Sequence, residues 1–221
     1  MVNDLNFDSC PHLWRWLKND LNIRTVIDIG AHDGAFAEFL ATWFAPEAVF
    51  AIEPLEACQP HLKARSDRIS GFQIFNVALS DNPGESVLFE NAHAPSSSLL
   101  HVSETMSMEF PFTVTTNPAK VQLARLDALL DPSRLHRDIL IKIDVQGMED
   151  KVIAGGKKVF STAKAVYIEM SFVELYEKQP CFHEVHALLS SLGFRLAGIK
   201  NQICSQKKGR PLFAHCVYLR V

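Results

Sequence analysis

Hydrophobic residues occur in short runs along this chain, and helical patterns separate most of those runs. Five runs rich in β-branched and apolar residues predict buried strands, at residues 25–29, 48–52, 72–78, 139–144 and 165–170. Helical patterns precede or separate them, at residues 11–19, 36–44, 57–65, 149–160 and 183–192. Strands that alternate with helices favour an α/β fold, in which helices cover both faces of a mostly parallel sheet.

The C-terminal part of the chain departs from this alternation. Residues 195–200 and 212–221 are two consecutive strand patterns, separated by the polar loop around residues 207–211. Two strands in direct succession predict an antiparallel hairpin. The chain has 221 residues, so we expect a single domain that spans residues 1–221, with an N-terminal helical segment at residues 1–24.

The alternation also breaks between residues 84 and 120. A short strand pattern at residues 86–90 precedes a serine-rich loop at residues 94–98, and Pro111 and Pro118 follow. Serine and proline favour turns and loops over regular elements. We therefore interpret residues 84–120 as an insertion that forms a lid or an element facing the substrate.

Composition and charge exclude some classes of partner. The chain is 48% hydrophobic and 21% charged, which is typical of a soluble globular domain. Its formal net charge of -3 gives no electrostatic basis for binding nucleic acid or an anionic membrane. We interpret the short basic run Lys207-Lys208-Gly209-Arg210 as a solvated loop.

The cysteines and the first residues indicate a reduced compartment. The five cysteines are Cys10, Cys58, Cys181, Cys204 and Cys216. Their number is odd and no C-x-x-C pair occurs, so neither a disulfide framework nor a zinc site is indicated. The first eight residues lack the pattern of an export signal, and no apolar run approaches the length of about 18 residues needed for a membrane span. We expect a cytoplasmic protein.

The segment Asp28-Ile29-Gly30-Ala31-His32-Asp33-Gly34 joins the first predicted strand to the next helix. A strand, a glycine-containing turn and a helix in this order bind nucleotide-like cofactors, because glycine allows the chain to turn sharply and the ligand to approach the backbone closely. Glu53 ends the second predicted strand, where a carboxylate accepts two ribose hydroxyls. His32 takes the place of the middle glycine of the dinucleotide fingerprint, and its side chain would obstruct a pyrophosphate. The turn therefore favours an adenosine cofactor without phosphates, and S-adenosylmethionine is the common one.

Six motifs in order resemble the FkbM family of S-adenosylmethionine-dependent methyltransferases. They are Asp28-Ile29-Gly30-Ala31-His32-Asp33-Gly34, Glu53-Pro54, Ala78-Leu79-Ser80-Asp81, Ser96-Ser97-Ser98-Leu99, Arg125-Leu126-Asp127 and Ile141-Lys142-Ile143-Asp144-Val145-Gln146-Gly147-Met148-Glu149. The likeness runs from about residue 26 to residue 194. It implies a class I methyltransferase fold, Rossmann-like and with a seven-stranded sheet. It also implies methyl transfer to oxygen, often to a hydroxyl of a sugar, a glycan or a secondary metabolite.

The resemblance further implies a set of cofactor-binding residues. They are Asp28, Gly30, Ala31, His32, Gly34, Glu53, Pro54, Ala78, Leu79 and Asp81. The backbone of the glycine turn would contact the methionine part of the cofactor, with Asp28 supporting that turn or acting as a structural cap. Glu53 would accept the ribose hydroxyls, and Ala78, Leu79 and Asp81 would border the adenine. Family members more often have asparagine at the position of His32, so this side chain is given no shared role.

Methyl transfer needs an aligned oxygen nucleophile and a group that takes its proton. In a parallel sheet such groups lie beyond the carboxyl ends of the strands, and Asp144 and Glu169 occupy such positions. We predict that Asp144 is the base or positions the substrate, with a helix cap as its structural alternative. Glu169 would hydrogen-bond the substrate or brace the following loop. His93 in the insertion is a further candidate base, since imidazole titrates near neutral pH.

Some alternatives stay open on the sequence alone. No metal site is assigned, although Asp144 and Glu169 also fit a version in which Mg²⁺ holds two substrate hydroxyls. A nicotinamide-dependent oxidoreductase is an alternative that His32 disfavours, and a non-catalytic binding module of the same fold is another. The expected acceptor is a small-molecule or carbohydrate hydroxyl, and a homo-oligomer is left open.

Overall fold

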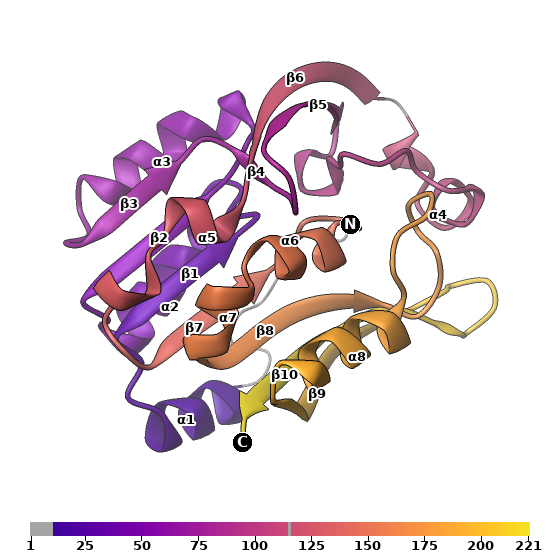
Figure 1. Cartoon of the computed structure of the whole chain (residues 1–221). Helices are drawn as coiled ribbons and strands as arrows, with labels where there is room; N and C mark the ends of the chain where they lie inside the picture. The colour runs from indigo at the N-terminus through magenta and orange to yellow at the C-terminus, as the bar shows by residue number, and fades with distance from the viewer. Residues whose placement is uncertain (1–10, 115) are drawn as a thin grey trace.

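Seven strands form one sheet in the computed structural model, which describes residues 11–114 and 116–221 (Figure 1). Their order across the sheet is β3-β2-β1-β7-β8-β10-β9. The strands are β1 (Thr25–Ile29), β2 (Ala48–Ile52), β3 (Phe72–Phe75), β7 (Ile139–Ile143), β8 (Ala163–Ser171), β9 (Phe194–Cys204) and β10 (Pro211–Arg220). Neighbours from β3 to β8 pair in parallel, which confirms the mostly parallel sheet.

Helices cover both faces of this sheet, as the alternating pattern predicts. One face carries α1 (Pro11–Asp20), α2 (Ala35–Phe44) and α3 (Gln59–Ser66). The other carries α5 (Leu126–Leu129), α6 (Glu149–Gly155), α7 (Lys157–Thr162) and α8 (Phe182–Ser191). Successive strand residues point to opposite faces, so Val26 packs in the core with α2 while Ile27 packs in the core with α6. Figure 1 shows α6, α7 and α8 in front of the sheet.

The strand β10 runs antiparallel to both of its neighbours, β8 and β9. The predicted C-terminal hairpin is therefore confirmed, and Figure 1 shows it in yellow at the lower right. Because β10 is reversed, its first residues lie beside the last residues of β8. His215 is thus the register partner of Glu169.

A second, three-stranded sheet consists of β4 (Ala78–Leu79), β6 (Thr116–Ala124) and β5 (Gly84–Asn91), in the order β4-β6-β5. The predicted strand at residues 72–78 is wrong as one element, because β3 ends at Phe75 and β4 pairs with β6 instead. Ala78 packs in a separate small core with Leu55, Leu88 and Val121. A continuous apolar run does not reveal that its two ends are buried against different sheets.

The insertion at residues 84–120 holds more regular structure than its composition predicts. It contains β5, η3 (Ala94–Ser96), α4 (Glu104–Glu109), η4 (Pro111–Thr113) and most of β6. Pro118 lies inside β6 opposite Phe89 of β5, whereas β4 pairs only with Leu123 and Ala124. Pro118 therefore has a strand neighbour on one side only, so its missing N–H interrupts no second ladder.

The predicted helix at residues 149–160 is also wrong as one element. It is divided into α6 and α7, and Gly156 lies between them. A β-carbon on Gly155 would lie 2.1 Å from the carbonyl oxygen of Ser80, so this helix end approaches the end of β4 more closely than other residues permit.

The N-terminal helical segment is present as α1, whereas residues 1–10, including Cys10, lie outside the described residues. The four described cysteines, Cys58, Cys181, Cys204 and Cys216, are free thiols. Within the described ranges, no helix has the length and apolar character needed to cross a membrane.

Candidate active site

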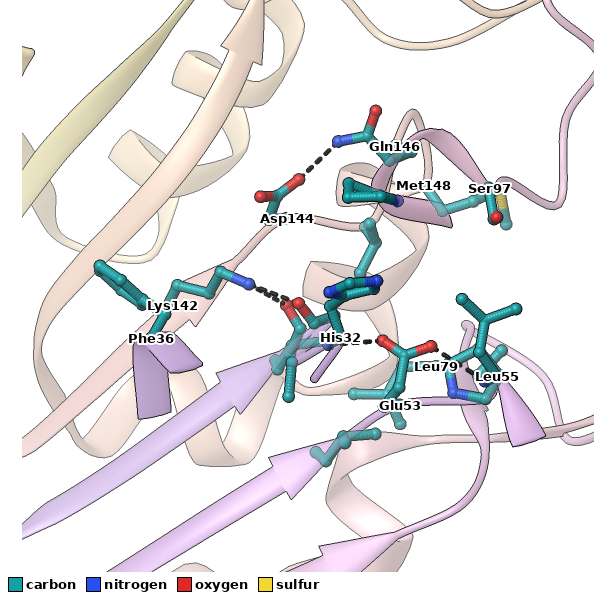
Figure 2. Close-up of a pocket in the computed structure, with 18 of the residues that line it drawn as sticks. His32, Phe36, Glu53, Leu55, Leu79, Ser97, Lys142, Asp144, Gln146 and Met148 are labelled. Atoms are coloured by element: carbon teal, nitrogen blue, oxygen red, sulfur yellow. Dashed lines mark hydrogen bonds between the residues drawn. The ribbon is translucent and has the colours of Figure 1, made fainter. Parts of the chain in front are cut away.

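A pocket lies at the carboxyl ends of β1, β2 and β7, where the two sheets meet (Figure 2). The glycine turn after β1 forms one wall, and the end of β2 and the start of β4 form another. The loop after β7 and the segment at residues 94–99 of the insertion complete it. Residues that represent these walls are His32, Glu53, Leu79, Ser97, Asp144 and Met148.

The glycine turn has a backbone that few residues adopt. Gly30 and Gly34 have φ angles of 72° and 82°, and His32 has a φ of 50°. Asparagine and histidine are among the residues that tolerate this left-handed region, so the local backbone accommodates His32. A β-carbon on Gly30 would lie 1.8 Å from the Asp144 carbonyl oxygen, so the turn after β1 contacts the end of β7 directly. At Gly34 the close neighbours are Leu62 and Arg65 of α3.

We expect Gly30→Ala to lower the free energy of unfolding by more than about 1–2 kcal/mol, which is the cost of the left-handed conformation alone. The clash with the backbone of Asp144 adds to this cost. Gly198→Ala in β9 is the matched control, because an added β-carbon there meets no atom within 4 Å. Urea unfolding of both variants measures the difference, and equal stabilities would contradict the proposed contact.

The Glu53 carboxylate is fixed at the end of β2 by two backbone donors. The His32 N–H donates to its Oε2 at 2.8 Å, and the Leu55 N–H donates to its Oε1 at 2.9 Å. Figure 2 shows both bonds, with Glu53 directly below the glycine turn. Burial raises the pKa of Glu53, and the two backbone hydrogen bonds oppose this shift. The carboxylate lines the pocket and keeps lone pairs for further donors.

A buried ion pair between β1 and β7 supports the glycine turn. Lys142 of β7 and Asp28 of β1 are register partners, and Lys142 Nζ lies 3.0 Å from Asp28 Oδ1. The same ammonium group donates to the carbonyl of Gly30, as Figure 2 shows. Burial lowers the pKa of Lys142, but the charges of Asp28 and Asp144 outweigh burial and raise it overall. Lys142 therefore stays charged and holds the turn in place.

Asp144 follows the end of β7, Glu169 lies near the end of β8, and one amide joins the two carboxylates. Gln146 Nε2 donates to Asp144 Oδ1 at 2.5 Å and to Glu169 Oε1 at 3.2 Å. Tyr176 in turn donates its hydroxyl proton to Gln146 Oε1 at 2.8 Å. Burial raises the pKa of Glu169 well above its ordinary value, and the charge of Asp144 adds to the shift. Asp144 is thus held at the pocket wall, and Gln146 links it to Glu169.

His215 of β10 reaches the same edge of the sheet. Its ring stacks on that of Tyr167 at 5.2 Å with an interplanar angle of 10°. Burial lowers its pKa to about 4, so the imidazole is neutral at physiological pH. A ring nitrogen of His215 and one oxygen each of Asp144 and Glu169 lie within 4.8 Å of one another.

The model of the methyltransferase FkbM domain matches residues 28–196 of this sequence. The chain belongs to the FkbM methyltransferase family. It is therefore a methyltransferase, as the resemblance of its motifs implied.

Among curated proteins, this FkbM-family methyltransferase is 29% identical over 174 residues to 2-O-methyltransferase NoeI of Sinorhizobium fredii. The match covers 75% of this chain and 71% of that protein. Many solved structures share its fold, among them two methyltransferases. The first is the methyltransferase FkbM of Methylobacillus flagellatus KT, with a TM-score of 0.56 and 14% identity. This match covers 90% of our chain, which spans only 44% of that longer structure.

The second structure is magnesium protoporphyrin IX methyltransferase (ChlM) of Synechocystis PCC 6803, which was solved with bound S-adenosylmethionine. Its TM-score is 0.50 at 12% identity, and the match covers 98% of this chain and 80% of that one. At such low identity the two structures are evidence for the fold alone, and they confirm the class I methyltransferase fold of this family member.

Most residues implied by the FkbM resemblance line the pocket. They are Gly30, Ala31, His32, Glu53, Pro54, Ala78 and Leu79, and the predicted base Asp144 lines the pocket as well. Three implied cofactor residues do not line it. Asp28 is buried against Lys142, Gly34 contacts α3, and Asp81 lies near Lys151, 3.4 Å from its ammonium group. Of these three, Asp28 is linked to the glycine turn through Lys142.

The other candidate residues take different places in this FkbM-family fold. His93 is not among the residues that line the pocket, and its Nδ1 lies 3.0 Å from the hydroxyl oxygen of Ser96. Glu169 reaches Asp144 through Gln146. Glu149 lies at the start of α6, as predicted, where its carboxylate accepts from the Gly147 N–H, and burial raises its pKa to about 7.

Among the residues that line the pocket, sequence reasoning assigned no role to Lys142, Gln146, Tyr167 and His215. Lys142 carries a signal that it is unusual, because it is a charged residue inside an otherwise apolar strand. His215 carries a weaker one, since it interrupts a run of apolar residues in β10. Gln146 belongs to the sixth motif of the resemblance but was given no role there, and Tyr167 lies in an apolar run, so only the tertiary structure reveals their place at the pocket.

Proposed function

We propose that this FkbM-family methyltransferase transfers the methyl group of S-adenosylmethionine to a hydroxyl of a carbohydrate or a small metabolite. One observation carries the cofactor assignment. The Glu53 carboxylate is buried, lines the pocket and is oriented by the His32 and Leu55 N–H groups. A carboxylate fixed in this way suits the two hydroxyls of a ribose, because hydrogen bonds to a charged acceptor are short and strong.

The remaining walls also suit S-adenosylmethionine. Ala78 and Leu79 present an apolar surface for an adenine ring, and the turn after β1 presents backbone groups for the amino acid part. Glu53 and Asp144 also line the pocket, and their negative charges favour a cationic sulfonium. When bound, the cofactor supplies an electrophilic methyl group on sulfur.

We assign to Asp144 the contact with the acceptor. Its carboxylate stands at the pocket wall beyond the end of β7, with Oδ1 bound to Gln146. The Oδ2 atom of Asp144 accepts no hydrogen bond from another described residue. In this proposal Oδ2 would accept the hydroxyl proton while the oxygen of the acceptor bonds to the methyl carbon, the carbon–sulfur bond breaks and S-adenosylhomocysteine leaves. The name of the curated relative, a 2-O-methyltransferase, supports oxygen as the atom that is methylated.

Calorimetry tests the cofactor assignment without any acceptor. We expect S-adenosylhomocysteine to bind and NAD not to bind. Glu53→Ala should weaken S-adenosylhomocysteine by about 100-fold or more, because two hydrogen bonds to a charged group are lost. Glu56→Ala is the matched control, since that neighbouring carboxylate is exposed and bonds Asn76 instead. NAD binding, or unchanged binding by Glu53→Ala, would reject the assignment.

A labelled-methyl screen tests the acceptor class. The wild-type chain would be incubated with methyl-labelled S-adenosylmethionine and a panel of methyl glycosides, with simple phenols and amines as comparison acceptors. We expect transfer to a glycoside hydroxyl. Transfer only to amines would overturn the O-methyltransferase proposal. Binding of S-adenosylhomocysteine without transfer to any acceptor in cell extracts would favour the non-catalytic module instead.

A further inference from the structure

We propose that Asp144, Glu169 and His215 form a binding site for one divalent metal ion beside the acceptor. The three residues come from, or directly follow, the adjacent strands β7, β8 and β10. One potential ligand atom from each lies within 4.8 Å of the other two, which is close enough for all three to contact one ion. The role toward the acceptor rests on the proposed function, whereas the metal site itself does not.

The carboxylates are oriented as metal ligands are. Gln146 binds Asp144 Oδ1 and Glu169 Oε1, and the hydroxyl of Tyr176 fixes Gln146 in turn. The second oxygen of each carboxylate, Oδ2 and Oε2, accepts no hydrogen bond from another described residue. Carboxylates that ligate metals are themselves hydrogen-bonded by a second shell of residues, and Gln146 supplies that shell here.

His215 is the observation that separates this site from an ordinary cluster of acidic residues. Its side chain is only 6% exposed, yet it lines the pocket. Its Nε2 lies 3.8 Å from Glu169 Oε2, which is too long for a hydrogen bond, and its Nδ1 has no hydrogen-bond partner among the described residues. A buried ring nitrogen without a hydrogen-bond partner is costly unless a ligand satisfies it. The stacked ring of Tyr167 holds this imidazole in its orientation.

The neighbouring ammonium group does not take the place of the ion. Lys142 Nζ is engaged by Asp28 and by the carbonyls of Gly30 and Ile29. No ion pair within 4.0 Å joins it to Asp144 or Glu169 among the described residues. The donor set of two carboxylates and one imidazole suits a first-row divalent ion such as Mn²⁺, and it leaves positions for two hydroxyls of an acceptor.

Electron paramagnetic resonance with Mn²⁺ alone tests the site, because bound Mn²⁺ loses the sharp signal of the free ion. We expect the wild-type chain to bind one Mn²⁺ without cofactor or acceptor. Asp144→Asn should abolish this binding, and Glu169→Gln and His215→Ala should each weaken it by about tenfold or more. Glu56→Gln is the matched control, since Glu56 is an exposed carboxylate outside both the pocket lining and the cluster.

Folding of each variant is checked by circular dichroism and urea unfolding, which require neither cofactor nor acceptor. Absence of Mn²⁺ binding by the folded wild-type chain would overturn the site. Binding that is unchanged in both Glu169→Gln and His215→Ala would overturn it as well. Because the titration includes no methyl acceptor, these outcomes do not depend on whether the proposed methyl transfer is correct.

Discussion

Asp144→Asn is expected to lower the rate of methyl transfer by about 10²–10⁴-fold while leaving S-adenosylhomocysteine binding nearly unchanged. That range is the usual contribution of a positioned general base. The amide has nearly the same shape as the carboxylate but cannot accept the hydroxyl proton, nor can it ligate a metal ion as a charged group. The measurement is initial rate with the glycoside that the labelled-methyl screen identifies, together with calorimetry of the same preparation.

The matched control for this experiment is Asp33→Asn. Asp33 lines the same pocket, but its carboxylate accepts from the Ala35 N–H and faces Arg65 of α3. The amide of the variant keeps an oxygen for the Ala35 bond, so we expect a change in rate of less than tenfold. If Asp144→Asn retains the wild-type rate, or if both variants lose activity equally, Asp144 does not act on the acceptor.

Lys142→Met is expected to lower the free energy of unfolding by about 3–5 kcal/mol, because it leaves the Asp28 carboxylate buried without its counter-charge. Asp28 is fully buried, and burial already raises its pKa against the opposing charge of Lys142. The carbonyl of Gly30 also loses its donor. S-adenosylhomocysteine should bind more weakly as well, since the turn that contacts it is no longer fixed. Denaturant unfolding measures the first effect and calorimetry the second.

Two further variants make this prediction specific. Lys63→Met removes an exposed ion pair with Asp67, and it should change stability by less than about 1 kcal/mol. The double variant Asp28→Leu with Lys142→Met should recover much of the lost stability, because neither charge is then buried alone. A Lys142→Met protein as stable as the Lys63→Met protein would show that the buried pair does not support the turn.

The sequence predicts the central sheet well because its strands are short apolar runs with clear ends. The predicted strands at residues 25–29 and 48–52 have the observed bounds of β1 and β2. The errors arise where tertiary contacts determine the bounds of a strand or helix. Residues 72–78 divide between two sheets. The strand β6 was not predicted because it contains Pro118, and the sequence does not show that Pro118 pairs with a strand on one side only. Gly156 divides a helical pattern that would otherwise be continuous.

The candidate site was partly predictable for a comparable reason. Glu53 and Asp144 follow parallel strands, so the general rule for such sheets places them at the carboxyl edge. His215 escapes this rule because β10 is reversed and brings its beginning, not its end, to that edge. Asp28 is a carboxylate in the cofactor-binding motif and was therefore expected near the ligand. Its side chain instead points into the core on the side of α2, where it pairs with Lys142.

The aromatic contacts of α1 have a consequence for how this protein can be shortened. Trp14 packs against Phe36 and Tyr167 at ring distances of 5.8 and 5.1 Å, and both of these rings line the pocket. The helix therefore forms the outer layer of the pocket wall, although its residues precede the region matched by the family model. A chain trimmed to the boundaries of that model would begin after this helix. It would also lack the first three residues of β1 and all of β10, so the pocket would lose both this outer layer and His215.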